Sequence, residues 1–298
     1  AVGRGAGFVR ALHANPQTCI TALCDIQEEV LRQRAEEMGV VLTYTNAEQM
    51  MDSGKVDAVI VATPMHLHAE QSILALERGL HVLSEVPAVV SFDEARALVQ
   101  AAKASSATYM MAENYCYMRP NVLVRHIVRA GLFGELYFGE GEYLHELKEL
   151  NEITRWRRRW QTGINGNTYP THSLGPCLQW FEPQRVVSVA CAGSGHHYRD
   201  PRGDMYENED TTVTLCRLSG GGLIKLRLDM LSERPHNMTY YSLQGTRGCY
   251  EAARGLGDVP KIWLADRCED KNCWLPLEDF TEEFLPEHLL NPPQEALQ

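Results

Sequence analysis

The stretch V-D-A-V-I-V-A-T-P at residues 56–64 is an apolar run that ends on a proline. Its β-branched residues favour a buried strand. Pro64 ends that strand because proline has no backbone N–H to donate to a ladder. A helical pattern follows over 68–79, and a second apolar strand is predicted over 80–84. A strand, a helix and a strand in this order are typical of a parallel sheet wrapped by helices.

The same alternation extends over the whole N-terminal part of the chain. Five strands are expected within the first 112 residues, and a sixth, preceding residue 1, would complete a doubly wound sheet. The first strand of the sheet is therefore expected to be missing from this sequence. The predicted strands cover 18–24, 40–43, 56–62, 80–84 and 107–112, and the predicted helices cover 8–14, 27–38, 46–51, 68–79 and 91–105.

The pattern changes after residue 120, where strands joined by turns predominate. The predicted strands cover 135–145, 185–192, 210–218, 223–230, 240–244 and 249–251, and the predicted helices cover 121–130 and 171–181. The sequence therefore predicts an α/β protein whose N-terminal domain, over 1–114, is a Rossmann doubly wound parallel sheet. A C-terminal α+β domain with a mainly antiparallel open sheet is expected over 115–298, with its end truncated. One face of that sheet would be open, so a homo-oligomer is expected through it.

Composition excludes several classes of protein. The net charge of −11 argues against a nucleic-acid surface, and no apolar run approaches the roughly 18 residues of a membrane span. The nine cysteines are scattered without a C-x-x-C motif, which indicates reduced thiols and no metal site. A cytoplasmic location is expected, with export as the open alternative.

Glycines head the first predicted helix in the motif G-R-G-A-G at residues 3–7. Gly3, Arg4 and Gly5 are the predicted contacts to a pyrophosphate, because glycine lets the backbone approach a phosphate at a helix N-terminus. Asp25 ends the next strand, about 20 residues on, where a carboxylate accepts from ribose hydroxyls. A carboxylate there disfavours a 2′-phosphate, so NAD is expected rather than NADP. The alternative is a glycine turn followed by a helix-capping aspartate.

Polar residues also follow the strand at 56–62. Thr63, Pro64 and His68 are expected at the carboxyl edge of the sheet, where ligands bind in open α/β folds. They are therefore further candidates for cofactor binding. For the histidine, capping of the following helix is the competing interpretation.

Two pairs of side chains in the second half could carry proton chemistry. Tyr143 and His145 lie two apart on a predicted strand, so they face the same side. Tyr169 and His172 lie three apart in N-T-Y-P-T-H, close enough to converge on one ligand. A histidine suits acid–base catalysis directly, whereas a tyrosine needs its pKa lowered by a nearby positive charge. The competing interpretations are a packed sheet tyrosine and a helix-capping histidine.

The motifs V-A-T-P-x-x-x-H at 61–68 and G-L-H-V-L-S-E-V-P-A at 79–88 resemble the Gfo/Idh/MocA family of NAD(P)-dependent sugar and inositol oxidoreductases. The usual strand-end motif of that family is Glu-Lys-Pro, with a lysine at or near the chemistry. Here Val86 takes the place of the lysine, and a valine cannot move a proton. The resemblance implies that Glu85 still touches the cofactor.

Three further motifs are similar to the NAD-dependent α-N-acetylgalactosaminidase branch of that family. They are M-x-E-N at 111–114, Y-L-H at 143–145 and Y-P-T-H-S-L-G-P at 169–176. The resemblance implies active-site positions for Glu113, Tyr143, Tyr169 and His172. Of these, Glu113 is grouped with the cofactor-binding residues, where ribose is its expected partner. His145 is grouped with the substrate-binding residues.

The resemblance to that branch implies a glycosidase that works through a transient oxidation. Tightly bound NAD would take a hydride from C3 of the sugar, and the resulting ketone would acidify the hydrogen at C2. Elimination at C1, addition of water and return of the hydride would complete the hydrolysis. His172, Tyr143 and Tyr169 are the expected catalytic residues. The alternatives are a conventional sugar or inositol dehydrogenase and a non-catalytic sensor of NAD and sugar.

The segment R-W-R-R-R-W at 155–160 is the one basic cluster in the chain. It has two interpretations, a surface segment with buried tryptophans or a substrate rim. In the second, Trp156, Arg157 and Trp160 would bind the sugar through ring stacking and charge.

Overall fold

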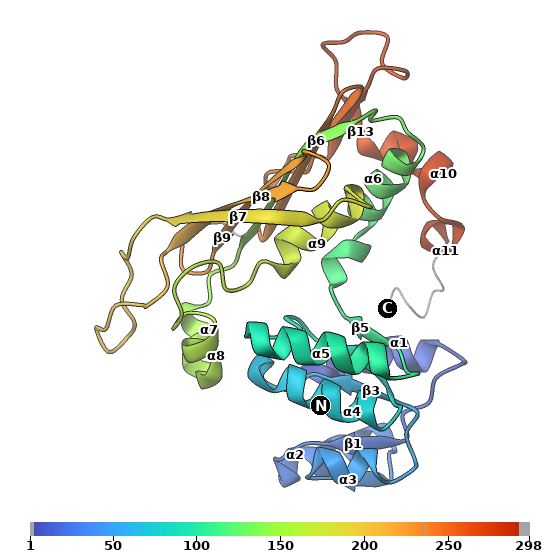
Figure 1. Ribbon diagram of the computed structural model, residues 1–298, viewed down its shortest axis with the longest axis vertical. Helices are drawn as coiled ribbons and strands as arrows, with labels where there is room; N and C mark the ends of the chain where they lie inside the picture. The colour runs from blue at the N-terminus through green and yellow to red at the C-terminus, as the bar shows by residue number, and fades with distance from the viewer. Residues whose placement is uncertain (1–2, 236, 292–298) are drawn as a thin grey trace. The chain divides into compact units, whose positions relative to one another are not determined.

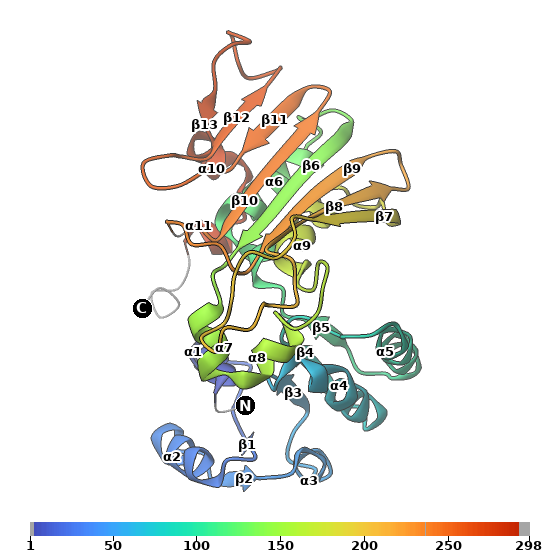
Figure 2. The same cartoon turned by 90° about the vertical axis from the view of Figure 1, so that its left-hand side faces the viewer.

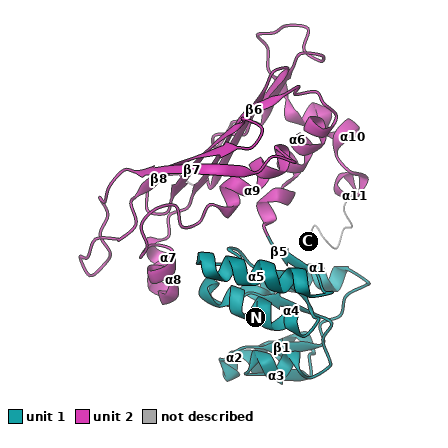
Figure 3. Ribbon diagram, in the orientation of Figure 1, with its two compact units in different colours: residues 1–112, 292–298 teal, residues 113–291 magenta. Residues whose placement is uncertain are grey.

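The computed structural model describes residues 3–235 and 237–291, which form two compact units (Figures 1 and 3). The first unit ends at Ala112, and the second runs over Glu113–Asn291. The boundary between the units therefore follows residue 112, two residues before the predicted domain end at residue 114. Residue 112 is also the last residue of the strand predicted over 107–112.

The strands of the first unit are the five that the sequence predicts, with trimmed ends. They are β1 (Ala22–Cys24), β2 (Leu42–Tyr44), β3 (Ala58–Val61), β4 (His81–Ser84) and β5 (Tyr109–Met111). All pairings are parallel, but they form two sheets, β1–β2 and β3–β4–β5, rather than the single expected sheet. In a doubly wound order one strand lies between β1 and β3, and no strand among residues 3–235 or 237–291 takes that place.

Helices alternate with these strands as predicted. They are η1 (Arg4–Phe8), α1 (Val9–Ala14), α2 (Glu28–Met38), α3 (Ala47–Met51), η2 (Met65–Leu67), α4 (His68–Glu77) and α5 (Phe92–Ala104). Two of these helices begin with a side-chain cap, because Asn46 accepts from the N–H of Gln49 and Ser91 accepts from the N–H of Glu94. The side chain of Glu94 in turn accepts from the N–H of Val90, which completes a reciprocal cap of α5.

The second unit is built on one eight-stranded sheet in the order β13-β12-β11-β10-β6-β9-β8-β7. Its strands are β6 (Leu136–Leu144), β7 (Val186–Gly193), β8 (Thr211–Leu218), β9 (Leu223–Asp229), β10 (Thr239–Gly245), β11 (Gly248–Glu251), β12 (Lys261–Leu264) and β13 (Leu275–Pro276). Every pairing is antiparallel except that of β6 with β9. The sequence predicted β6 to β11. It missed β12 and β13 because runs of four and two residues are too short to show an alternation.

The described helices of the second unit are η3 (Asn114–Tyr117), α6 (Arg119–Arg129), α7 (Lys148–Ile153), α8 (Arg155–Trp160), α9 (Thr171–Trp180), η4 (Leu277–Phe280), α10 (Thr281–Phe284) and α11 (Glu287–Leu290). Of these, α6 and α9 lie on one face of the sheet (Figure 2), whereas α7 and α8 lie beyond its end. The main core forms where α6 and α9 meet the sheet, around Ile127, Trp180 and Leu226. None of the described helices is both long and apolar enough to cross a bilayer.

Helix α9 packs directly on the backbone of β6. A Cβ built on Gly141 would overlap the carbonyl oxygen of Ser173, and one on Gly139 would lie 2.9 Å from the ring of Phe181. Both glycines share a face of β6 with Tyr143. The missing side chains therefore allow the helix to lie close to the strand that carries this tyrosine.

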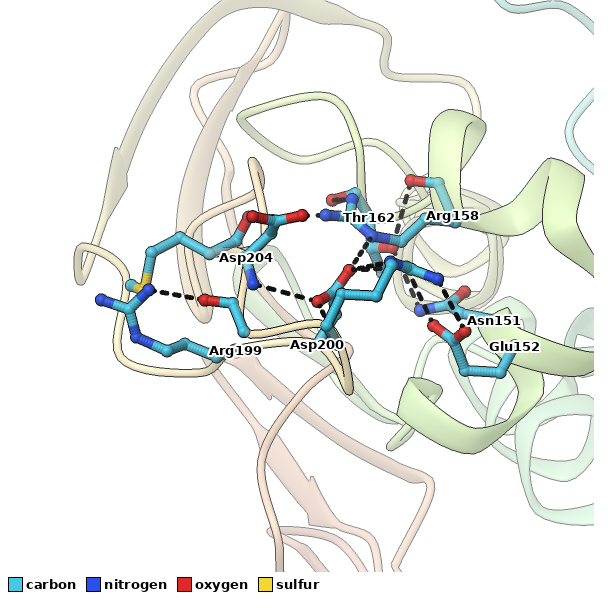
Figure 4. Close-up of polar contacts among 10 residues, drawn as sticks. Asn151, Glu152, Arg158, Thr162, Arg199, Asp200 and Asp204 are labelled. Carbon is cyan, nitrogen blue, oxygen red and sulfur yellow. Dashed lines mark hydrogen bonds and ion pairs between the residues drawn. The ribbon is translucent and has the colours of Figure 1, made fainter.

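The long connection between β7 and β8 is held to α7 and α8 by a buried carboxylate (Figure 4). Asp200 accepts from the guanidinium of Arg202 at 2.5 Å and from the backbone N–H groups of Arg202 and Asp204. Arg202 also reaches Glu152 of α7 at 3.0 Å, and Arg158 of α8 lies 3.7 Å from Asp200. Burial alone would raise the pKa of Asp200, but these hydrogen bonds hold it below its ordinary value.

Gly141→Ala is expected to destabilise the protein, because the added methyl group meets backbone that cannot move aside. Overpacking of this kind costs about 1–3 kcal/mol. Gly255→Ala is the matched control, since a Cβ at Gly255 would meet no atom within 4 Å. Thermal unfolding of both variants measures the difference. Equal midpoints for the two variants would contradict the close packing of α9 on β6.

Asp200→Asn is expected to lower the unfolding midpoint at neutral pH. The folded-state pKa of Asp200 is depressed, so its contribution is fully present above its unfolded pKa of about 4. The contribution is lost as the pH falls through the lower, folded-state value, so the two midpoints should converge in acid. Asp204→Asn serves as a control in the same loop, because Asp204 is bonded to Asp200 through its backbone N–H and carbonyl groups, which the substitution keeps. A midpoint difference that stays constant down to acid pH would contradict this role.

Candidate functional site

A buried carboxylate–imidazole pair lies at the centre of the candidate site. Glu113 follows β5 by two residues and caps η3, and His172 is the second residue of α9. Nδ1 of His172 lies 2.8 Å from Oε1 of Glu113, and the two residues are only 6% and 5% exposed. Opposite an ionised carboxylate, which only accepts hydrogen bonds, Nδ1 is the donor, and a neutral imidazole then keeps Nε2 as an acceptor.

Three tyrosine rings surround the imidazole of His172. Tyr115 of η3 lies closest, with its ring centroid 4.2 Å from that of the histidine. Tyr143 of β6 follows at 4.9 Å, and Tyr169, just before α9, lies at 5.2 Å. Tyr143 and Tyr169 also contact one another, with centroids 5.7 Å apart. Phenol and imidazole groups from three elements are thus gathered within one cluster.

A glycine in the sequence motif explains how Glu113 comes so close to α9. A Cβ built on Gly175 would lie 2.9 Å from Cγ of Glu113 and 2.9 Å from Sγ of Cys116. The second glycine-dependent contact is the one between Gly141 and Ser173 described above. The glycine of Y-P-T-H-S-L-G-P is therefore required by packing, since any larger residue would displace the carboxylate from His172.

The backbone at the start of α9 is fixed as well. The hydroxyl of Tyr241 on β10 donates to the carbonyl oxygen of His172 at 2.6 Å. Burial raises the pKa of Tyr241 far above its ordinary value, so the hydroxyl keeps its proton and remains a donor. The position of His172 is thus held from the sheet side, independently of its ring.

The predicted pairing on β6 brings Tyr143 and His145 into direct contact. The hydroxyl of Tyr143 lies 2.7 Å from Nδ1 of His145. This contact follows from the alternation of the strand, which puts residues two apart on one side. A half-buried imidazole therefore adjoins the buried phenol.

In the first unit, the turn at Glu85 is tied to the glycine motif. Nε of Arg4 donates to Oε1 of Glu85 at 2.9 Å, and Oε2 accepts from the N–H of Val86. A Cβ at Gly3 would meet no atom within 4 Å, so packing inside the unit does not require a glycine there. Open backbone at the head of the first helix suits the approach of a pyrophosphate. Asp25 directly follows β1, where a ribose-binding carboxylate is expected.

His68 joins the two turns that carry predicted cofactor residues. Its Nδ1 lies 2.8 Å from the carbonyl oxygen of Pro87, and its Nε2 lies 2.8 Å from that of Thr63. The chain itself therefore engages both ring nitrogens, so His68 shapes the turns around Thr63, Pro64 and Glu85. The hydroxyl of Thr63 is bonded to Gln71 of α4.

The basic segment forms α8, and its arginines divide between two roles. Arg158 belongs to the network around Asp200 and lies over the ring of Tyr206 at 4.7 Å. Arg157 lies over the ring of Trp156 at 4.4 Å and donates to Gln161. Arg159 lies over the ring of Trp160 at 5.2 Å. Sugar binding by Trp156, Arg157 and Trp160 stays a prediction.

The structure brings together Glu113, Tyr143, His145, Tyr169 and His172, all of which the sequence singled out. It pairs Glu113 with His172, whereas the sequence grouped it with the cofactor residues. A contact of Glu113 with ribose stays a prediction. Tyr115 was missed, although it follows the M-x-E-N motif by a single residue. Its position two residues after a predicted site carboxylate was the only available signal.

Two protein families account for almost the whole chain. Residues 2–113 match the oxidoreductase family with an NAD-binding Rossmann fold, and residues 117–292 match the C-terminal domain of glycosyl hydrolase 109. A glycosyl hydrolase family 109 protein of Saccharopolyspora erythraea is 32% identical over 277 residues, covering 83% of this chain and 60% of that protein. An alpha-N-acetylgalactosaminidase of Shewanella oneidensis is 31% identical over 265 residues, covering 78% and 56%. The chain thus spans about 60% of the length of such relatives.

Solved structures share the fold at lower identity. The WlbA dehydrogenase of Bordetella pertussis, in complex with NADH and UDP-GlcNAcA, has a TM-score of 0.76 at 20% identity, over 91% of this chain and 82% of that one. Levoglucosan dehydrogenase with NADH also has a TM-score of 0.76 at 20% identity, over 93% and 77%. The solved structures show the fold alone, and the two family matches show that the chain belongs to glycosyl hydrolase family 109 and carries the NAD-binding Rossmann domain of the Gfo/Idh/MocA oxidoreductases.

Proposed function

We propose that this chain hydrolyses a glycoside through transient oxidation of its sugar, with NAD as a recycled cofactor. The pair of Glu113 and His172, set among Tyr143 and Tyr169, is the observation that carries the proposal. An α-N-acetylgalactosaminide is the proposed substrate class, because a relative of 31% identity bears that activity in its name. Val86 supports the same assignment, since it removes the lysine on which the ordinary dehydrogenases of the family depend.

We propose that the first unit binds NAD. Gly3, Arg4 and Gly5 would face the pyrophosphate, and Asp25 the ribose. Thr63, Pro64 and Glu85 would shape the remaining contacts. When bound, NAD would supply a hydride acceptor for C3 of the sugar and later a hydride donor. A cycle with no net oxidation has no need to exchange the cofactor, so tight binding is proposed.

The second unit is the proposed source of the proton chemistry. Glu113 holds Nδ1 of His172, so that Nε2 can take a proton from the 3-hydroxyl or from C2 of the sugar. Tyr143 and Tyr169 would position the sugar or relay protons, and His145 is the immediate partner of the Tyr143 hydroxyl. Loss of the C2 proton beside a C3 ketone allows the group on C1 to leave, and water then adds to the enone.

Turnover of p-nitrophenyl α-N-acetylgalactosaminide in D₂O is expected to release nitrophenol without accumulation of NADH. The product sugar should carry deuterium at C2, because the proton removed there is replaced from solvent. Mass spectrometry and NMR of the product measure this exchange, and absorbance at the nicotinamide band follows NADH.

His172→Asn is the companion variant, because the asparagine amide can still donate to Glu113 while the base is lost. The variant is expected to lose at least about a hundredfold in kcat, the range of a general base. Stoichiometric NADH would instead support a conventional dehydrogenase, and nitrophenol release without deuterium at C2 would exclude the elimination route. Binding of NAD and sugar without any turnover would support a sensor.

We also propose that copies of this chain associate through the sheet face opposite α6 and α9. That face carries a row of Leu215, Lys225 and Glu140 in register across β8, β9 and β6, with Leu215 exposed. Ion pairs of Glu140 with Lys225, and of Glu142 with Arg254, give the surface both signs of charge. A surface of mixed polarity suits pairing of a face with its own copy.

Light scattering is expected to give a mass of at least two chains. Leu215→Arg should lower that mass toward a single chain, because a second like charge beside Lys225 repels across the interface. Val41→Arg is the control, since Val41 is fully exposed in the first unit. A single-chain mass for the unchanged protein would overturn this proposal.

A reducing compartment is the proposed environment. All nine cysteines are free, and Cys19, Cys191 and Cys273 are exposed. Exposed free thiols persist where disulfide formation is suppressed.

A further inference from the structure

We infer that Tyr115 is a positioning residue for the pair formed by Glu113 and His172. It contacts both members of that pair, one through its backbone and the other through its ring. The inference deepens the proposed function and rests on it for the role of His172. Neither the family matches nor the sequence motifs assign a role to this tyrosine.

The first contact is with the carboxylate. The backbone N–H of Tyr115 donates to Oε1 of Glu113 at 3.1 Å, and the same oxygen accepts from Nδ1 of His172. A carboxylate that accepts from two donors is fixed in direction, since both bonds are charge-assisted. The geometry of η3 therefore determines where Glu113 points.

The second contact is with the imidazole ring. The two ring centroids are 4.2 Å apart at an interplanar angle of 64°, closer than the contacts of His172 with Tyr143 or Tyr169. One hydrogen bond at Nδ1 tolerates a range of angles, so the imidazole plane can still turn to some extent about the Cβ–Cγ bond. An edge-on aromatic neighbour restricts that rotation, and such ring pairs are worth about 0.5–1.5 kcal/mol.

Tyr115 is itself held from two other sides. Its carbonyl oxygen accepts from the buried side chain of Asn121 on α6, at 2.8 Å. Its hydroxyl donates to the sulfur of Met238, just before β10. The backbone of Asn121 in turn accepts from the indole of Trp180 on α9. The tyrosine is thus braced against α6 and the sheet, which makes it a rigid support.

Several ionisable groups face His172 from the surrounding elements. Glu113 approaches from the end of β5, Tyr143 from β6 and Tyr169 from the segment before α9. Tyr241 of β10 reaches only the backbone carbonyl of His172. Tyr115 contacts both the carboxylate and the imidazole. Its loss should therefore affect their mutual orientation more than the charge around them.

The test compares Tyr115→Phe with Tyr115→Leu. Phenylalanine keeps the ring and the backbone donor and loses the hydroxyl that bonds to Met238, whereas leucine removes the ring. Tyr117→Leu is the matched control, because Tyr117 is an exposed tyrosine in the same turn. Tyr115→Met provides a second non-aromatic variant if leucine prevents folding, which the thermal midpoint reports.

The direct readout is the tautomer of His172, from long-range ¹H–¹⁵N spectra in which His172→Asn identifies its signals. We expect a single Nδ1–H form in the unchanged protein, in Tyr115→Phe and in Tyr117→Leu, and a mixture of tautomers in Tyr115→Leu. With the nitrophenyl substrate, kcat of Tyr115→Leu should fall about tenfold, while KM stays within about twofold of its value in the unchanged protein. This combination is expected when the catalytic base is misoriented and substrate binding is unchanged. Tyr115→Phe should keep most of the activity.

A single Nδ1–H tautomer and unchanged kcat in a folded Tyr115→Leu or Tyr115→Met protein would overturn the inference. An equal loss in Tyr115→Phe would also overturn it, by locating the effect in the hydroxyl. Absence of turnover by the unchanged protein would count against the proposed function alone, because the tautomer measurement needs no substrate.

Discussion

The hydrogen bond between Glu113 and His172 is the constraint on which the rest of the candidate site depends. A charge-assisted bond of this kind gains strength when water is excluded, and both residues are almost fully buried. Burial has a cost, because either group alone would be desolvated without compensation. The surrounding packing has to hold the two together, and the glycines at 141 and 175 show how it does so. Each removes a side chain that would separate α9 from β6 or from Glu113.

The other carboxylate that the sequence singled out has a different environment. Glu85 is paired with Arg4, whose side chain is 69% exposed, and exposed ion pairs contribute little to stability. Its second oxygen accepts from the N–H of Val86, so the carboxylate mainly shapes the turn after β4. In the same unit, both ring nitrogens of His68 are engaged by backbone carbonyl oxygens. The contrast explains why a strand-end carboxylate in the first unit need not take part in acid–base chemistry.

Local pattern predicted much of the fold and part of the site. Apolar, β-branched runs located β1 to β11, and alternation predicted that Tyr143 and His145 share a side, which their hydrogen bond confirms. The separation of β1–β2 from β3–β4–β5 was not predicted, because strand pairing depends on elements distant in sequence.

Helix α8 was missed because its arginines show no apolar periodicity. Asp200, which is paired with Arg158 of this helix, lies about 40 residues away in a loop. Glu113 and His172 are 59 residues apart, so no spacing rule could join them.

Val86, which stands where the family usually has a lysine, bears on the source of the proton chemistry. Its side chain is 7% exposed, so it serves packing in the turn that Glu85 and Pro87 define. A lysine at this position would place an ammonium in a buried environment, where its charge would need a partner. Glu85 is the neighbouring carboxylate, but Arg4 already occupies one of its oxygens and the backbone of Val86 the other. Under the proposed function, proton transfer therefore has to come from side chains with an available acceptor, and Nε2 of His172 is such an acceptor, with its ring held by the carboxylate on one side and by Tyr115 on the other.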